Sequence, residues 1–395
     1  MLTDLTKRQQ DWLDRAVALR EEVLAPNARE IDATGRFPKE NFDAIRDSGL
    51  FFIGVPESVG GAGNDLLGIA LVCEEFARGC ASTAMSFGMH VNSWAPWAAL
   101  ATKEQVKEHL APGIEAKQLA THANTERATG TQFWNWMSNA EKTNDGWKLT
   151  AEKAFVTSAG EADAYWYTSR PGKDAPMNAA ALWYVDASKG GWEVTDPWHG
   201  MGLRGQQSAR MMFTDIDVPD SAAFCADGSL LEAGFKPIIE ALVPTLCSNF
   251  LGMAQALVDH TANHVKNRVH QNTGLRLSQV DMVQERVGAM QTQVDACRNL
   301  IQNVCTFAAR VNDLEQELVP LLETKSHVAR TCSEIAEQAL HACGAIAYRG
   351  DTEVSRCYRD AVAAPIMAPS QDWCNIFIGR ALLGEPLFGE EPPAE

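Results

Sequence analysis

The chain has 395 residues, of which 46% are hydrophobic and 22% charged. This is the composition of a soluble globular enzyme and not of a disordered chain, and at roughly 150 residues per domain it predicts two to three domains. The net charge of −17 argues against a nucleic-acid partner, whose phosphates need a basic face. No apolar run approaches the roughly 18 residues that cross a bilayer, and the start lacks a signal-peptide core. We therefore expect a cytoplasmic protein without membrane contact.

The ten cysteines are scattered from Cys73 to Cys374 without a Cys-x-x-Cys pair. In a chain of this size, such scatter is typical of reduced thiols in the core. No group of cysteines and histidines has the spacing of zinc ligands, so we expect no metal site.

Helical patterns open the chain, over a predicted N-terminal α-helical domain at residues 1–112. Apolar residues recur at helical spacing from Trp12 to Val23, with charged residues between them. A turn-rich passage with three glycines follows at 56–63, and a helix rich in small residues comes after it.

Short strands dominate the predicted middle domain, residues 113–235. Segments 147–150 and 181–185 are runs of strand formers bounded by Gly, Asp and Asn. The stretch 211–219 alternates along its second half and stops at a proline. Seven of the 11 tryptophans fall between residues 134 and 198, which predicts an aromatic core or cavity there.

Long helical patterns return in the predicted C-terminal domain, residues 236–395. Segments 238–267 and 280–311 are almost free of Gly and Pro, and a third helix is expected over 321–343, just after Pro320. Helices of such lengths form a bundle. The chain therefore predicts an α+β protein in the order helices, small β domain, helix bundle.

This order, together with four motifs, resembles the acyl-CoA dehydrogenase superfamily over essentially the whole chain. The motifs are Pro56-Glu57-x-x-Gly60-Gly61-x-Gly63, Thr125-Glu126 with Gly130-Thr131, Lys153-Ala154-Phe155-Val156-Thr157-Ser158-Ala159-Gly160, and Met201-Gly202-Leu203-Arg204 leading to Phe213-Thr214-Asp215-Ile216-Asp217-Val218-Pro219. The resemblance implies an N-terminal helical domain, a small middle β-barrel or sandwich domain and a C-terminal four-helix bundle. It also implies a flavin, FAD or FMN, between the β domain and the bundle.

The resemblance assigns residues to this flavin. Phe155 is expected to pack against the flavin ring and Thr157 to bond near its N5 atom, since residues two apart on a strand share a face. The remaining cofactor contacts implied by the resemblance are Asn124 and Thr125 at the pyrimidine edge, Thr131 at the flavin phosphate, and Arg268 and Ser370 at a pyrophosphate or phosphate.

The chain departs from the family at the catalytic base. The usual glutamate lies twelve residues before an arginine, here Arg380, and its position holds Ala368. The alternative base position, on the first bundle helix, holds Leu242, and Glu240 lies on the wrong face of a regular helix. Because removal of an α-proton from an acyl thioester needs a carboxylate, acyl-CoA dehydrogenation is disfavoured.

The thioester and adenine contacts are altered as well. Val243 replaces an arginine that the family often places near the thioester, and Pro244 predicts a kink in the same helix. Segment 268–272 keeps its arginine but loses the aromatic residue under adenine, and segment 341–345 departs from the family's Gln-x-x-Gly-Gly. A lost aromatic stack weakens binding by about 1 kcal/mol, which favours FMN or transient flavin binding.

These losses resemble a branch of the superfamily, the flavin-dependent monooxygenases similar to dibenzothiophene, indole and indoleacetate oxygenases. In that branch reduced flavin, often supplied by a separate flavin reductase, reacts with O2, so no α-proton base is required. The site needs a dry pocket and an acid or base near a small aromatic, indole-like substrate. The alternatives are acyl-thioester oxidation with an unusual base, and a flavin-dependent binding role without catalysis.

Three polar residues are candidates for the acid or base. The resemblance places the segment of His90 over the reactive side of the flavin, His122 lies two residues before Asn124, and Asp372 lies four residues after Ala368. For each of them, the alternative is a structural polar residue with satisfied hydrogen bonds. The predicted substrate lining is aromatic and comprises Trp94, Phe133 and Trp134, of which the last two have β-domain core as their alternative.

The helix expected over 280–311 has more apolar positions than one buried face explains. In the resembling fold, such helices pack as a dimer of dimers and Arg268 reaches a neighbour's flavin. We therefore predict a homotetramer.

Overall fold

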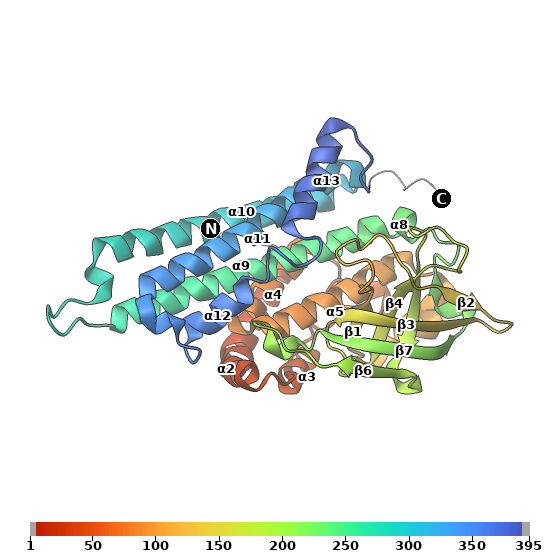
Figure 1. Cartoon of the computed structure of the whole chain (residues 1–395), viewed down its shortest axis with the longest axis horizontal. Coiled ribbons are helices and arrows are strands. Elements are labelled where there is room, and N and C mark those ends of the chain that lie inside the picture. Colours follow the sequence, from red (N-terminus) through yellow and green to blue (C-terminus); the bar gives the residue numbers. More distant parts are fainter. Residues whose placement is uncertain (1–4, 389–395) are drawn as a thin grey trace.

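The structure, a computed structural model, describes residues 5–388 in three consecutive parts. N-terminal helices are followed by two small sheets and then by a bundle of long helices, which confirms the predicted α+β order. The sheets lie at one end of the molecule, and the long helices extend away from them to the other end (Figure 1).

The N-terminal part is helical to residue 115, so the predicted limit at residue 112 falls inside its last helix. Thr6 and Gln9 cap the first helix with reciprocal side chain-to-backbone hydrogen bonds, and Trp12 is buried as the periodicity predicts. In the turn-rich passage, a Cβ on Gly61 would lie 2.1 Å from the Val55 carbonyl oxygen, so this position requires glycine. The elements are α1 (Lys7–Leu19), η1 (Arg20–Leu24), α2 (Ala25–Thr34), α3 (Lys39–Asp47), η2 (Glu57–Val59), α4 (Leu66–Gly79), α5 (Ala81–Leu100), α6 (Lys103–Gln105), η3 (Val106–Leu110) and α7 (Ala111–Glu115).

The middle part consists of two four-stranded sheets. The first has the order β1 (Ala120–Ala123), β4 (Ala164–Ser169), β5 (Ala181–Asp186), β8 (Ala223–Phe224); the second has the order β2 (Ala140–Lys142), β3 (Trp147–Val156), β7 (Ala209–Val218), β6 (Trp192–Asp196). The pair β1–β4 is parallel and the other pairs are antiparallel. Short helical turns η4 (Ala187–Lys189), η5 (Arg204–Gln206) and η6 (Asp220–Ala222) join the strands.

The tryptophan-rich stretch forms an aromatic core. Trp166 and Trp183 are fully buried. The rings of Tyr165 and Tyr167, on β4 of one sheet, lie 5.5 Å and 5.4 Å from the ring of Phe213, on β7 of the other. Aromatic side chains therefore join the two sheets.

The C-terminal part comprises α8 (Leu230–Ala233), α9 (Phe235–Asn267), η7 (Leu277–Gln279), α10 (Asp281–Val311), α11 (Leu314–Cys343), η8 (Gly344–Tyr348), α12 (Glu353–Ala361) and α13 (Gln371–Leu383). The predicted start of the third long helix is wrong, because α11 begins before Pro320 and continues through it. Asp313 caps α11, and its own N–H donates to the Glu317 side chain, so a strong cap starts the helix early. The helix α9 likewise continues through Pro244.

The helix α9 is the centre of the molecule. It packs against α4 and α5 of the N-terminal part and against α10 and α11 of the bundle. By length and composition α9 is apolar enough to cross a membrane, contrary to the expectation from apolar runs, but 94% of its most apolar window is buried inside the structure. That burial is typical of a core helix.

The ten cysteines are all free, as predicted, and Cys225 is the one that is half-buried while the others are buried. Within residues 5–388, no group of three or more His, Cys, Asp or Glu side chains is arranged to hold a metal ion.

Candidate functional site

A buried ion pair joins two of the sequence motifs. Lys153 Nζ lies 2.6 Å from Glu126 Oε1 and also donates to the Thr168 carbonyl oxygen (2.6 Å) and to Ser138 Oγ (3.0 Å). Burial lowers the pKa of Lys153 to about 8, although Glu126 opposes this. Burial acts to raise the pKa of Glu126, but the Lys153 charge and its hydrogen bonds bring that pKa below its ordinary value. The pair fixes the segment around Thr125 relative to β3; its two residues stand in separate motifs 27 positions apart, and no local pattern indicates that they meet.

Phe155 and Thr157 do not share one face of a regular strand, contrary to the prediction. The register of β3 shifts between Lys153 and Val156, Phe155 has a φ of 53°, and the strand ends at Val156. Phe155 is 67% exposed, with its ring 6.5 Å from that of Trp198. Thr157 lies beyond the strand, with Oγ1 2.9 Å from Ser208 Oγ. An exposed aromatic ring therefore lies two residues along the chain from a hydroxyl pair.

Unpaired polar atoms lie next to this hydroxyl pair. Ser158 Oγ and Gln206 Oε1 are buried without a hydrogen-bond partner among the described residues, and the Ser158 N–H donates to the Gln206 carbonyl oxygen (2.9 Å). Buried polar atoms are normally paired, so their partners are expected from a ligand or water. An exposed aromatic face beside hydroxyls and unpaired oxygens fits a flat heterocycle with a polar edge, and a flavin is such a group.

Asn124 and Thr125 follow β1 and lie beside β3. The Thr125 carbonyl oxygen accepts from the Ala154 N–H (2.8 Å). The Asn124 side-chain oxygen accepts from Trp136 Nε1 (2.9 Å), so its amide nitrogen is the group left for a ligand. The structure thus brings Asn124, Thr125 and Phe155 into one region, as the resemblance implied.

Thr131 and Ser370 are brought together by Trp373. Trp373 Nε1 donates to Thr131 Oγ1 (2.9 Å), across 242 positions of sequence. Ser370 caps α13, and its Oγ accepts from the Trp373 backbone N–H (3.4 Å). The predicted phosphate contacts therefore lie where the middle part meets the last helix.

His90 lies in the core of the N-terminal part. Its Nε2 lies 2.9 Å from the Phe51 carbonyl oxygen, and its Nδ1 accepts from the Ala120 N–H at 3.2 Å. Its ring stacks on that of Phe51 with centroids 4.1 Å apart, and Trp94 is fully buried in the same cluster. Burial lowers the pKa of His90 to about 3. Both ring nitrogens are occupied, which contradicts the predicted acid–base role of His90, and the burial of Trp94 contradicts its place in a substrate lining.

His122 is the more available histidine. It is half-buried on β1, and its Nε2 lies 3.1 Å from the Asn92 carbonyl oxygen. Burial lowers the pKa of His122, so it is neutral near pH 7. Its Nε2 also lies 3.3 Å from Asn92 Nδ2, so this nitrogen donates to the carbonyl oxygen in one tautomer and accepts from the amide in the other, and Nδ1 takes the opposite role. Within the described chain, Nδ1 makes no hydrogen bond, and Asn92 Oδ1 is buried without a partner.

Glu240 is engaged elsewhere in the bundle. Its carboxylate pairs with Lys236, whose Nζ also lies 3.4 Å from Glu317 Oε2 on α11. Burial raises the pKa of Glu240, with Lys236 opposing and Glu317 reinforcing this shift. Leu242 is half-buried on the same helix. Glu240 is therefore not free to replace the missing base.

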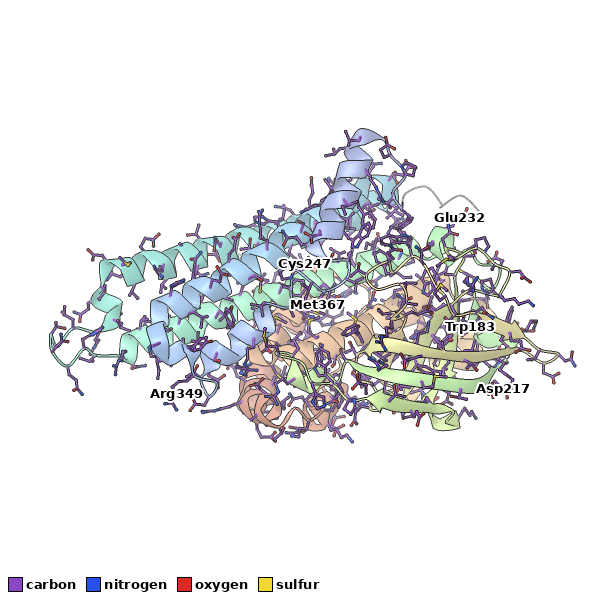
Figure 2. The ribbon with its side chains drawn as sticks, viewed as in Figure 1. Trp183, Asp217, Glu232, Cys247, Arg349 and Met367 are labelled. Carbon is purple, nitrogen blue, oxygen red and sulfur yellow. The ribbon has the colours of Figure 1, made fainter. Side chains whose placement is uncertain are left out.

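The segment before α13 is held by a buried lysine. Lys325 Nζ donates to the carbonyl oxygens of Met367 (2.9 Å) and Ala364 (3.3 Å), and burial lowers its pKa. Met367 lies near the middle of the molecule (Figure 2). The next residue, Ala368, is exposed, and Asp372 is exposed in the first turn of α13. No carboxylate stands at position 368, and the nearest one along α13 faces solvent.

Phe133 and Trp134 form the contact between the middle part and α13. The Trp134 ring lies 4.6 Å from that of Trp373 and 5.4 Å from that of Phe377. Phe133 is half-buried and packs edge-on against Trp134 at 5.0 Å. These side chains form an aromatic wall between two parts of the molecule and do not belong to the core between the sheets.

Arg268 lies apart from this region. It is exposed and ends α9, where the chain turns towards α10. That turn lies at the end of the bundle remote from the sheets (Figure 1). Arg268 therefore does not belong to the flavin residues of its own chain, and its contact with a neighbour's flavin stays a prediction.

A cavity of about 260 Å³ lies between the N-terminal part, α9 and α12, and is lined by Arg20, Arg78, Asp259, His260 and Arg356 among others. None of the predicted site residues lines it. Its arginines are already paired, Arg78 with Asp259 at 2.7 Å and Arg356 with Glu353 at 2.7 Å. The cavity is therefore distinct from the candidate site.

Comparisons with known proteins cover all three parts of the chain. Family models match at residues 6–117 (acyl-CoA dehydrogenase, N-terminal domain), 121–216 (middle domain) and 245–368 (C-terminal domain). Probable acyl-CoA dehydrogenase YngJ of Bacillus subtilis (strain 168) is 28% identical over 389 residues, which are 96% of this chain and 99% of YngJ.

Solved structures share the fold. Butyryl-CoA dehydrogenase from Megasphaera elsdenii superposes with a TM-score of 0.89 at 24% identity, covering 97% of this chain and 100% of that chain. FMN-bound TdsC from Paenibacillus sp. A11-2 gives 0.85 at 20% identity, covering 96% and 100%. PigA with FAD and proline gives 0.85 at 20% identity, covering 98% and 100%. Because the family's three domains match in order along the chain, this protein belongs to the acyl-CoA dehydrogenase superfamily of flavin-dependent oxidoreductases.

Proposed function

We propose that this protein is a monooxygenase that uses reduced flavin and O2 on a small aromatic, indole-like substrate. The observation that carries the proposal is the lack of a carboxylate at both base positions, which hold Ala368 and Leu242. Oxidation of an acyl thioester begins with removal of an α-proton, whereas oxygenation by reduced flavin has no such step. The chain therefore lacks, at both positions, the carboxylate that acyl-thioester oxidation needs and that oxygenation does not need.

Neither Glu240 nor Asp372 fills this gap. Glu240 is held by Lys236 and lies beside the buried Glu317. Asp372 is exposed at the start of α13, as is Ala368 just before it. His122 supplies a neutral imidazole whose Nδ1 is free of hydrogen bonds to the described chain, so it is the first acid–base candidate and Asp372 the second.

The cofactor residues that we propose follow the resemblance. Phe155 contacts the flavin ring, and Thr157 with Asn124 and Thr125 supplies polar contacts at its edge. Thr131 and Ser370 stand at the phosphate, and FAD and FMN are both compatible with this set. When bound, the reduced flavin would supply the electrons that activate O2, and the protein would orient the flavin and keep water away.

The aromatic wall supports an aromatic substrate. Phe133, Trp134 and Trp373 lie together beside Thr131, one of the proposed flavin contacts. Aromatic rings favour offset or edge-on contact with another flat ring, worth about 0.5–1.5 kcal/mol per pair beyond the buried area. An indole-like substrate would gain such contacts, whereas a linear acyl chain would not.

Acyl-CoA dehydrogenation with an unusual base is the second candidate. It is favoured by the relative YngJ, which is named a probable acyl-CoA dehydrogenase and aligns with nearly the whole chain. The two candidates differ in what reduces the flavin: the acyl-CoA itself in a dehydrogenase, and an external reductant in an oxygenase.

An anaerobic titration separates the candidates. The protein is loaded with oxidised FAD or FMN and mixed with short and long acyl-CoAs, with butyryl-CoA dehydrogenase as positive control. We expect no bleaching of the flavin absorbance in this protein. With a flavin reductase, NADH and O2, indole should gain oxygen from labelled O2. Bleaching by any acyl-CoA, or the absence of labelled oxygen from every product of an aromatic panel, would contradict the proposal.

A further inference from the structure

One hydrogen bond joins the two walls of the candidate flavin site. Trp373 is in the first turn of α13, and Thr131 is in the connection between β1 and β2. Trp373 Nε1 donates to Thr131 Oγ1 at 2.9 Å. None of the sequence motifs contains Trp373.

The chemistry of this bond fixes the role of the Thr131 hydroxyl. An indole N–H is a donor only, whereas a hydroxyl has one hydrogen and two acceptor positions. The oxygen of Thr131 must therefore accept from Trp373, and its own hydrogen remains available to a further partner. Thr131 is exposed, so that partner can be a ligand. A phosphate, which offers acceptor oxygens and negative charge, is the kind of group that such a donor suits.

The indole is held in place by its neighbours. The Trp373 ring packs edge-on against Trp134 at 4.6 Å and lies 5.5 Å from the Phe377 ring. The same residue is anchored through its backbone N–H, which donates to the Ser370 side chain that caps α13. A donor fixed in this way is already oriented before a ligand arrives, which reduces the entropy that binding costs.

We propose that Trp373 is a positioning residue that orients the Thr131 hydroxyl as a donor to the flavin phosphate, and thereby sets the preference of the site for a phosphorylated flavin. The inference rests on the flavin cofactor of the proposed function. It does not depend on whether the chemistry is oxygenation or dehydrogenation.

The test compares FMN with riboflavin, which lacks the phosphate. Dissociation constants are measured from flavin fluorescence for the full-length wild type, Trp373→Phe, Thr131→Val and the double variant, with oxidised flavins and, anaerobically, with reduced flavins. Each single variant should weaken FMN binding about tenfold, the size of one hydrogen bond to a charged acceptor, and leave riboflavin binding nearly unchanged. The double variant should lose no more than either single variant, because both act on one bond.

Trp192→Phe is the matched control. It makes the same substitution and removes an indole N–H bond of the same length, from Trp192 Nε1 to the Ala187 carbonyl oxygen (2.9 Å), which lies on the second sheet away from Thr131, so it should not change the ratio of FMN to riboflavin affinity. Circular dichroism of every variant verifies that the chain is folded.

Several outcomes would overturn the inference. If Trp373→Phe weakened FMN and riboflavin equally, the indole would serve packing alone. If it tightened FMN binding, the indole would be an obstacle to the phosphate. The role of Trp373 would also be refuted if the ratio of FMN to riboflavin affinity were unchanged in Trp373→Phe or in Thr131→Val. The same holds if the wild type bound FMN no more tightly than riboflavin. Neither result would count against flavin binding itself. Failure of every flavin to bind would refute the flavin cofactor itself, a result distinct from the others.

Discussion

Replacing His90 by glutamine should make the stability of the protein less sensitive to acid. Burial holds the pKa of His90 at about 3 in the folded state, against about 6.5 in an unfolded chain. The folded state therefore favours the neutral ring. The stability due to this preference is fully present above about pH 6.5 and is lost as the pH falls from there towards 3.

The size of the effect follows from linkage. Between the two pKa values, each pH unit removes about 1.4 kcal/mol from the free energy of unfolding for one histidine. Acidification from about pH 7 to about pH 5 should therefore cost the wild type roughly 2 kcal/mol through His90 alone. Glutamine does not titrate, and its amide N–H can still donate towards the Phe51 carbonyl oxygen. The free energy of unfolding of His90→Gln should therefore not fall by this amount on acidification.

Urea unfolding followed by tryptophan fluorescence measures the difference. The free energy of unfolding of both proteins is plotted against pH, and carboxylates and the other histidines contribute equally to the two curves. The wild type should lose stability more steeply below neutral pH. Parallel curves would refute the buried, neutral His90 and would reopen its predicted acid–base role. His90→Gln should also keep flavin binding, because no ring nitrogen faces the candidate site.

Three further predictions concern the site and its assembly. Lys153→Met leaves the buried Glu126 carboxylate unpaired and should destabilise the protein by about 3–5 kcal/mol in thermal unfolding, with part recovered in Lys153→Met/Glu126→Gln; no loss would contradict the buried pair. Arg268→Ala should weaken flavin binding, while sedimentation of the variant still shows a tetramer. If the wild type sedimented as a monomer at micromolar concentration, Arg268 could not contact the flavin of a neighbouring subunit. The purified protein should be mostly flavin-free and bind reduced flavin more tightly than oxidised flavin, whereas FAD retained through dialysis would show a rebuilt adenine pocket.

The helices and strands were largely predictable from local patterns. Apolar periodicity placed α9 and α10 within a few residues, because their buried faces follow the helical repeat. The local pattern does not give the start of α11, because a proline is most common in the first turn of a helix and Pro320 lies further inside this one. In the structure the cap at Asp313, with Glu317, begins the helix earlier and Pro320 is accommodated inside it.

The site was less predictable, because its geometry depends on contacts distant in sequence. The motifs identified the region of Thr125, Thr131 and Phe155, but alternation along a strand could not show the positive φ of Phe155. His90 belongs to the core through bonds to residues 39 and 30 positions away. The bond between Trp373 and Thr131 spans 242 positions, and no local pattern contains it.

The ionisable groups near the candidate site favour one kind of chemistry. The hydroxyls of Thr157 and Ser208 donate and relay hydrogen bonds, but they do not take an α-proton at neutral pH unless a base activates them. His122 is neutral and has one ring nitrogen without a hydrogen bond to the described chain, while Glu240 is held by Lys236. A reaction whose difficult step is proton removal would have to rely on His122, and burial makes this imidazole a weaker base by lowering its pKa. A reaction in which O2 is the oxidant and reduced flavin supplies the electrons that activate it requires from the protein oriented donors, an aromatic wall and the exclusion of water, and these are the features that this chain retains.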